Sequence, residues 1–364
     1  MVARVGRVQG VITVSMIQSF SRGIDTARIG ACFMVVLLHV AAVEFHEFDD
    51  RWWASNFYDS LTRACVPVFL MITGVLLLNR QEDLPVFFRK RYVRVLPPLV
   101  FWSLFYLGWY TWQGEDYGGV LGGLKSMLSG PVAFHLWYLY AIVGIYLFVP
   151  FLRHIWQSAS RAEQHLYLFL WMVASALPMM GRLAGSDVDV LNTYELGAFF
   201  GLLGYLFLGA YVHKAFSRQV RKSAYWWLSL FLFVLFSVLT MVATWLYSLH
   251  RGHPDPLFYD YLSPFVIAAA VCAFNVLYGA GFKANRAARL SEQSWSVLNQ
   301  LAASTLGIYC VHIFVLDVLR NHTGLMQGNG SAWWAIPLAA VAVFAVTWAL
   351  VSVLRTLRPL RHVT

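Results

Sequence analysis

Residues 224–249 read AYWWLSLFLFVLFSVLTMVATWLYSL and contain no charged side chain. About 20 predominantly apolar residues are enough to cross the hydrocarbon core of a bilayer as a helix. Backbone polar groups inside lipid must find their partners within the segment, which a helix provides and an isolated strand does not. This stretch therefore predicts a membrane-embedded, helical protein.

The same apolar pattern recurs along all 364 residues, of which 59% are hydrophobic and only 12% charged, with a mean hydropathy of +0.60. Soluble domains carry roughly 25% charged residues. The 15 Trp and the 16% aromatic content are typical of chains with two membrane interfaces. We predict an all-α, polytopic integral membrane helical bundle of about ten transmembrane helices, at 27–45, 60–79, 95–113, 134–152, 164–181, 195–212, 224–249, 261–281, 301–320 and 333–355.

The distribution of charge predicts the orientation of these spans. If both termini are cytoplasmic, 21 of the 27 Lys and Arg residues lie inside, whereas 13 of the 18 Asp and Glu residues lie outside. The opposite orientation would violate the positive-inside rule at almost every loop. The basic residues on the inside also account for the net charge of +9. We expect them to meet anionic lipid head groups, and a nucleic acid is not needed to explain them.

The loops leave no room for a separate soluble catalytic domain. We expect a cytoplasmic N-terminal segment (1–26), a single transmembrane domain (27–355) and a cytoplasmic tail (356–364). The four cysteines lie in apolar runs without a C-x-x-C pair, which indicates reduced packing residues. No metal-ligand spacing is present, and we predict no metal.

The first predicted span carries Asp25, Arg28 and His39. Ionisable groups inside a membrane are costly, so each is a candidate functional residue. Eleven helical positions make three turns plus about 20°, so Arg28 and His39 share one stripe about 16 Å apart. A cation at the cytoplasmic mouth below an imidazole suits a ligand that enters from the cytoplasm. Alternatively, Arg28 anchors the topology and His39 is a packing histidine.

The loop before the third span contains Arg91 and Arg94, followed by Pro97 and Pro98. Residues three apart at a helix start lie on one face, and arginine forks suit phosphates. The other interpretation is an ordinary positive-inside cluster. The proline pair should kink the third span or delay its start.

Three further groups of residues are candidates. Thr73 and Gly74, in the second span, allow close approach of another helix or of a narrow ligand. His135 and Trp137 suit either an aromatic belt or a sugar ring that stacks on aromatic faces. Thr305, Tyr309 and His312 follow i, i+4, i+7 spacing and form a polar stripe for substrate or for structural hydrogen bonds.

Taken together and in order, these blocks resemble a known family. They are Asp25-x-x-Arg28 with ten residues to His39, Val-Pro-Val-Phe-Leu-Met-Ile-Thr-Gly (66–74), Arg91-x-x-Arg94 before a proline pair, His-Leu-Trp-Tyr-Leu (135–139) and Leu-Gly-Ile-Tyr-x-x-His (306–312). This arrangement is similar to the integral-membrane acyltransferase-3 family, in its stand-alone O-acetyltransferase form. Thr73 replaces the usual Ser of the family and Leu70 its second Phe.

The resemblance implies a multi-pass enzyme of the bacterial inner membrane. It would transfer an acyl group, usually acetyl, from cytoplasmic acetyl-CoA to a hydroxyl of a lipid-linked or polymeric saccharide such as an exopolysaccharide unit. Arg28, Arg91 and Arg94, with Thr73 and Gly74, would bind the donor. His39 would be the general base, because imidazole titrates near neutral pH. Asp25 would hold Arg28, and the acceptor would meet His135, Trp137, Tyr309 and His312.

Direct transfer and a covalent acyl-enzyme both fit this resemblance. Two other functions fit the residues alone. One is a transporter or flippase of saccharide or lipid, which would use broken helices and no acyl-CoA. The other is a non-catalytic scaffold for glycan-assembly proteins, in which His39→Ala would leave the glycan unchanged.

Overall fold

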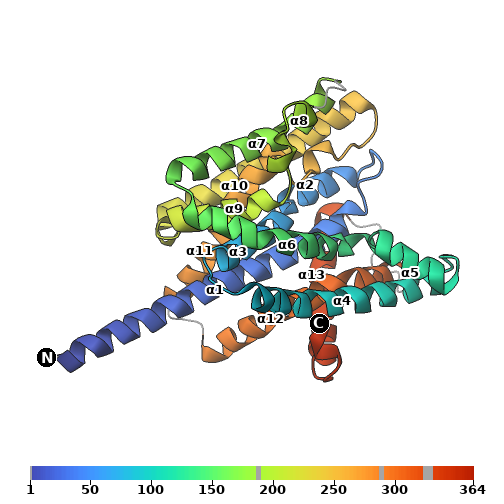
Figure 1. Cartoon of the computed structure of the whole chain (residues 1–364). Coiled ribbons are helices and arrows are strands. Elements are labelled where there is room, and N and C mark those ends of the chain that lie inside the picture. Colours follow the sequence, from blue (N-terminus) through green and yellow to red (C-terminus); the bar gives the residue numbers. More distant parts are fainter. Residues whose placement is uncertain (1, 186–189, 287–290, 323–330) are drawn as a thin grey trace. The chain divides into compact units, whose positions relative to one another are not determined.

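The protein is all-helical in the computed structural model (Figure 1), which describes residues 2–185, 190–286, 291–322 and 331–364. No strand occurs within these ranges, which confirms the predicted fold class. The longer helices are α1 (Val2–Ala42), α2 (Trp52–Thr62), α3 (Cys65–Leu77), α4 (Leu84–Trp112), α5 (Gly119–Ser129), α6 (Trp137–Ser158), α7 (Arg161–Leu183), α9 (Leu203–Phe216), α10 (Ser223–Arg251), α11 (Pro264–Arg286), α12 (Glu292–Asp317) and α13 (Ala332–Leu354).

Short helical turns connect these helices: η1 (Phe134–Leu136), α8 (Val190–Thr193), η2 (Leu196–Phe199), η3 (Gln219–Arg221), η4 (Leu257–Tyr259), η5 (Val318–His322) and η6 (Leu360–His362). The α7 start follows from its sequence. Ser160 accepts a hydrogen bond from the Glu163 backbone, and the Glu163 carboxylate accepts one from the Ser160 backbone, which together satisfy two of the unpaired donors of the first turn. At the other end of a span, α10 stops at Gly252, whose φ of 77° is left-handed.

Eight segments of the described chain are long and apolar enough to cross a membrane. They are Gln18–Ala42, Trp52–Leu77, Phe134–Ser158, Arg161–Leu183, Ser223–Arg251, Leu257–Lys283, Gln293–Asn321 and Ala332–Leu354. The protein is therefore a multi-pass membrane protein. The two remaining predicted spans correspond to α4, whose first half is rich in arginine, and to α9, which has 14 residues. The count of ten and the cytoplasmic termini stay predictions.

The chain forms two compact units. Unit 1 comprises residues 1–76, 159–305 and 329–341. In this unit α11 packs against both α1 and α10, and α2 packs against α1 and α10. Glycines permit the tightest approaches: Gly209 of α9 lies against the Met71 backbone of α3, and Gly281 of α11 lies against the Arg22 backbone of α1.

Unit 2 comprises residues 77–158, 306–328 and 342–364. Its α4 packs against α6 and against η6 at the end of the chain. Trp102 of α4 donates its indole N–H to the Val363 carbonyl at 2.7 Å, and Gly307 of α12 lies against the Thr364 backbone. The last residues are thus part of the packed unit, which the predicted cytoplasmic tail did not anticipate.

The proline pair does not delay the third predicted helix, because α4 begins at Leu84 and continues through Pro97 and Pro98. The alternative, a kink at the pair, stays a prediction. Proline has no N–H, so the carbonyls of Val93 and Arg94 lack their usual intrahelical donors. The helix continues because Trp102 and Tyr106, beyond the pair, are anchored to the C-terminal residues and to α12.

Candidate active site

One unbroken helix, α1, carries the predicted catalytic residues of unit 1. Arg28 donates to the Asp25 carboxylate at 3.3 Å, as the family resemblance implied, and Ser21 donates to the other oxygen of this carboxylate at 3.3 Å. His39 is half-buried. Because α1 has no break between Arg28 and His39, their separation along the helix is about 16 Å, as expected for eleven residues.

Thr73 and Gly74 lie on α3, also in unit 1. The Thr73 hydroxyl donates to the Phe69 carbonyl one turn earlier, at 2.9 Å. A Cβ added to Gly74 would lie 1.9 Å from the Leu206 carbonyl oxygen. Gly74 therefore allows the close approach of α9 to α3, and the approach of a narrow ligand stays a prediction.

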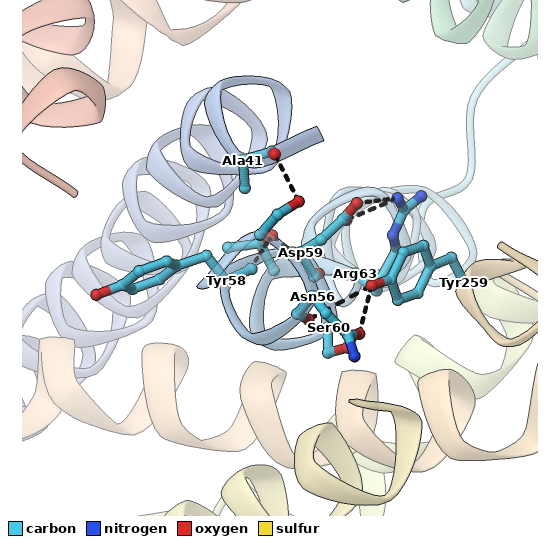
Figure 2. Close-up of polar contacts among 9 residues, drawn as sticks. Ala41, Asn56, Tyr58, Asp59, Ser60, Arg63 and Tyr259 are labelled. Atoms are coloured by element: carbon cyan, nitrogen blue, oxygen red, sulfur yellow. Dashed lines mark hydrogen bonds and ion pairs between the residues drawn. The ribbon is translucent and has the colours of Figure 1, made fainter. Parts of the chain in front are cut away.

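A buried polar network lies close to the His39 end of α1 (Figure 2). The Asp59 carboxylate, 1% exposed, pairs with Arg63 at 2.6 Å. The Arg63 guanidinium lies 4.3 Å from the Tyr259 ring centroid, and the Tyr259 hydroxyl donates to the Asn56 side chain at 2.6 Å. Ser55 donates to the Ala41 carbonyl at 2.8 Å, two residues after His39. The network thus ties the end of α1 to α2 and η4.

Arg63 was not selected in the sequence analysis, although it falls within the predicted second span (60–79). The second span runs from Trp52 to Leu77, so Arg63 lies inside it, in the turn between α2 and α3. Pairing with Asp59 and contact with an aromatic face reduce the cost of burying its charge. The sequence signal was Asp59 and Arg63 at i, i+4 within an apolar segment, and it was missed because the span was predicted to begin at residue 60.

The two predicted arginines of unit 2 occupy different environments. Arg91 is 8% exposed, pairs with Glu82 at 2.7 Å and lies over the Phe87 ring. Arg94 is exposed. The pKa of Glu82 is lowered by a hydrogen bond from Lys90 and by the nearby charge of Arg91. The predicted phosphate fork is therefore divided into one arginine held by a carboxylate and one open to solvent.

Arg153 is a basic residue of this region that the sequence analysis did not select. It is 7% exposed, and its guanidinium donates to the carbonyls of Leu77 at 3.2 Å and Glu82 at 3.4 Å. Its guanidinium lies 4.9 Å from the centroid of the Phe87 ring, which Arg91 also contacts, at 4.5 Å. Just after α13, burial and the charges of Arg361 and Arg94 lower the pKa of Arg355. These three cations therefore lie near one another.

His135, Tyr309 and His312, all predicted to meet the acceptor, come together in unit 2. Both imidazoles are fully buried, and their ring centroids are 5.2 Å apart. The Tyr309 hydroxyl donates to the His135 carbonyl. His312 Nδ1 faces the carbonyl of Tyr309 at 2.7 Å, and carbonyls only accept, so Nδ1 carries the proton and Nε2 the lone pair. Trp137 is half-buried and contacts the Tyr138 ring.

Tyr106 joins this cluster and was not predicted. Its ring lies 5.1 Å from that of His135. Its hydroxyl donates to the Cys310 carbonyl at 2.9 Å and accepts from the Phe314 N–H at 3.1 Å. The cluster brings together two imidazoles and two phenols, which are groups that can both donate to and accept from hydroxyls. Among the residues that the structure describes, no three His, Cys, Asp or Glu side chains converge as a metal site would require.

Comparison with known proteins identifies the family. A family model described as an acyltransferase domain, that of the acyltransferase-3 family, matches residues 21–352. This range includes all five motif blocks of the sequence. No match was found among curated proteins or among solved structures.

Proposed function

The chain belongs to the integral-membrane acyltransferase-3 family, and from this premise we propose that it moves an acetyl group from cytoplasmic acetyl-CoA to a saccharide hydroxyl. The observation that carries the proposal is the Asp25–Arg28 ion pair on the same unbroken helix as His39. Arg28, which is paired with Asp25, and the imidazole of His39 lie on the same face of this helix. We assign the protein to the bacterial inner membrane on the same family ground.

The donor side follows from the chemistry of coenzyme A, whose phosphates need cations and cannot enter the hydrocarbon core. Arg28 is half-buried and Arg94 is exposed, whereas Arg91 is held by Glu82. Arginine binds phosphate through two parallel hydrogen bonds. Thr73 is half-buried, and we assign it to the path of the pantetheine arm. Gly74 allows α3 to pack closely against α9.

The reaction requires a base because a sugar hydroxyl is a weak nucleophile at neutral pH. In the proposed step the acceptor oxygen attacks the thioester carbonyl while His39 takes the hydroxyl proton. The C–S bond then breaks, and the imidazolium returns the proton to the coenzyme A thiolate. The products are an acetyl ester and free thiol. The same residues also allow a covalent acyl-enzyme, in which His39 or Thr73 first accepts the acetyl group.

The acceptor side rests on the cluster of His135, Tyr309 and His312, with Trp137 at the start of α6. Imidazole and phenol groups donate to and accept from hydroxyls, and aromatic rings stack on the C–H faces of sugars. We propose a lipid-linked or polymeric surface glycan as the acceptor, with glycan-assembly proteins as partners.

The test uses full-length protein in nanodiscs with radiolabelled acetyl-CoA and a lipid-linked glycan extract. The proposal predicts saturable donor binding and transfer of label to glycan. Donor binding without transfer of label would contradict the proposal that a saccharide is the acceptor. If no acetyl-CoA binds at physiological salt, the acyltransferase proposal fails and transport of saccharide or lipid becomes the leading function. The break between α2 and α3 at residues 63–64 is the feature that would then be examined.

A further inference from the structure

Asp317, at the end of α12 in unit 2, accepts hydrogen bonds from three neutral donors. Its Oδ2 accepts from the Trp109 indole at 2.8 Å and from the Gln113 amide at 2.5 Å, while its Oδ1 accepts from the Asn321 amide. A carboxylate offers about four acceptor sites, so these three bonds leave capacity for a further donor. Asp317 is half-buried, and Gln113 and Asn321 are exposed, so a ligand can reach this edge.

The helix is deformed at this point. Directly after Asp317, α12 widens into the π-helical turn η5 (Val318–His322). One turn earlier the Tyr106 hydroxyl contacts both the Cys310 carbonyl and the Phe314 N–H, the two groups that an α-helix pairs with each other. π-helical turns are rare and are frequent at functional sites. Within this turn the Asn321 amide donates to the Asp317 carboxylate, four residues earlier.

Aromatic rings flank the same carboxylate. Trp109 lies with its ring 4.9 Å from that of Trp112 and 4.8 Å from that of Phe314. Trp112 is 67% exposed. An interfacial aromatic belt would explain Trp112 alone. It would not explain a carboxylate surrounded by amide and indole donors beside it.

This group of residues continues the acceptor cluster. Phe314 contacts the Trp109 ring and donates its backbone N–H to the Tyr106 hydroxyl, and the Tyr106 ring lies against His135. All of these residues belong to unit 2. A carboxylate, two amides and an exposed indole face together match the hydroxyls and the C–H face of a pyranose ring.

We propose that Asp317, Gln113, Asn321 and Trp112 form a subsite for one uncharged pyranose unit of the acceptor. Sugar hydroxyls donate to the Asp317 carboxylate and accept from the two amides, while the ring stacks on Trp112. A uronic acid brings a second carboxylate beside Asp317, and the like charges repel. The subsite thus selects neutral sugars over acidic ones. Calling this sugar the acceptor rests on the proposed acetyl transfer, whereas binding itself does not.

The experiment measures sugar binding without an acyl donor. Full-length protein is placed in nanodiscs, because maltoside detergents are themselves sugars, and tryptophan fluorescence is titrated with methyl glucoside, galactoside and mannoside and their uronate counterparts. The wild type should bind at least one neutral sugar about tenfold more tightly than its uronate, the scale of one charge-assisted hydrogen bond. Asp317→Asn should abolish this preference. Trp112→Ala should weaken both members of the pair.

Trp334→Ala is the matched control, because Trp334 is 74% exposed and lies in unit 1. It should leave every titration unchanged. The inference is overturned if no neutral sugar binds the wild type, if the uronates bind as tightly, or if Trp112→Ala and Asp317→Asn have no effect. If Asp317→Asn does not fold, the exposed Trp112 still decides. Selective sugar binding without acetyl transfer would uphold the subsite and reject the proposed function. Acetyl transfer with no difference in binding between neutral sugars and uronates would uphold the proposed function and reject the subsite.

Discussion

The carboxylate of Asp59 and the guanidinium of Arg63 form an ion pair 2.6 Å apart within the second membrane span. The pair is shielded by Tyr259 and Asn56, and the same helix holds the end of α1 through Ser55 and Ala41 (Figure 2). The segment that carries His39 is therefore fixed by a polar network inside an apolar span.

Removing one member of this pair should destabilise the protein. Asp59→Asn or Arg63→Gln leaves an uncompensated buried charge or donor, with a typical loss of about 3–5 kcal/mol in the free energy of unfolding. Equilibrium unfolding in detergent measures this loss. The double variant Asp59→Leu/Arg63→Met is the control and should recover much of it, since no charge remains unpaired. Single variants as stable as the wild type would refute the role of the pair.

Gly74→Ala should also destabilise unit 1. The added Cβ would overlap the Leu206 carbonyl of α9, and overpacking typically costs about 1–3 kcal/mol. Gly144→Ala in α6 is the matched control, because its Cβ would meet nothing within 4 Å. The thermal midpoints of the two variants should move in opposite directions. Equal effects would show that α3 does not pack on α9 at this position.

The two arginines of the donor motif should behave differently. Arg94→Gln should weaken acetyl-CoA binding by about tenfold, the scale of one charge-assisted hydrogen bond, without lowering thermal stability. Arg91→Gln should lower both acetyl-CoA binding and thermal stability, because Glu82 loses its buried partner. Filter binding and thermal unfolding of each variant measure the two effects. Unchanged donor binding in Arg94→Gln would exclude it from the donor site.

The contacts of Glu82 with Lys90 and Arg91 should make the stability of the protein depend on pH. The pKa of this carboxyl is lowered from its ordinary 4.5 in the folded state, chiefly by the hydrogen bond from Lys90. Its contribution is therefore complete above pH 4.5 and is lost as the pH falls through the lowered pKa. Thermal unfolding between pH 7 and pH 3 should show a steeper decline for the wild type than for Glu82→Gln. Parallel curves would contradict this assignment.

The sequence was sufficient to predict the helical class, because long uncharged runs allow no other structure in lipid. The alignment of Arg28 with His39 follows from the periodicity of one helix, and the family resemblance implied the Asp25–Arg28 pair. The common location of Tyr309 and His312 follows from i, i+3 spacing in the same way.

Contacts between distant segments could not be predicted from one sequence. The Asp59 network depends on Tyr259, some 200 positions away, and Tyr106 reaches α12 through a helix whose prolines suggested a break. The division of Arg91 from Arg94 depends on Glu82, which lies on the preceding loop and shows no periodic relation to the arginine pair.

Single-turnover transfer of radiolabelled acetyl from acetyl-CoA to the lipid-linked glycan, in the wild type and in His39→Ala, tests the central claim most directly. Loss of the general base should slow transfer by roughly 10²–10⁴-fold while donor binding is unchanged. His46→Ala, an exposed histidine beyond the end of α1, should transfer at the wild-type rate. Wild-type transfer by His39→Ala would contradict the account, because no proton acceptor on the proposed stripe would then be needed.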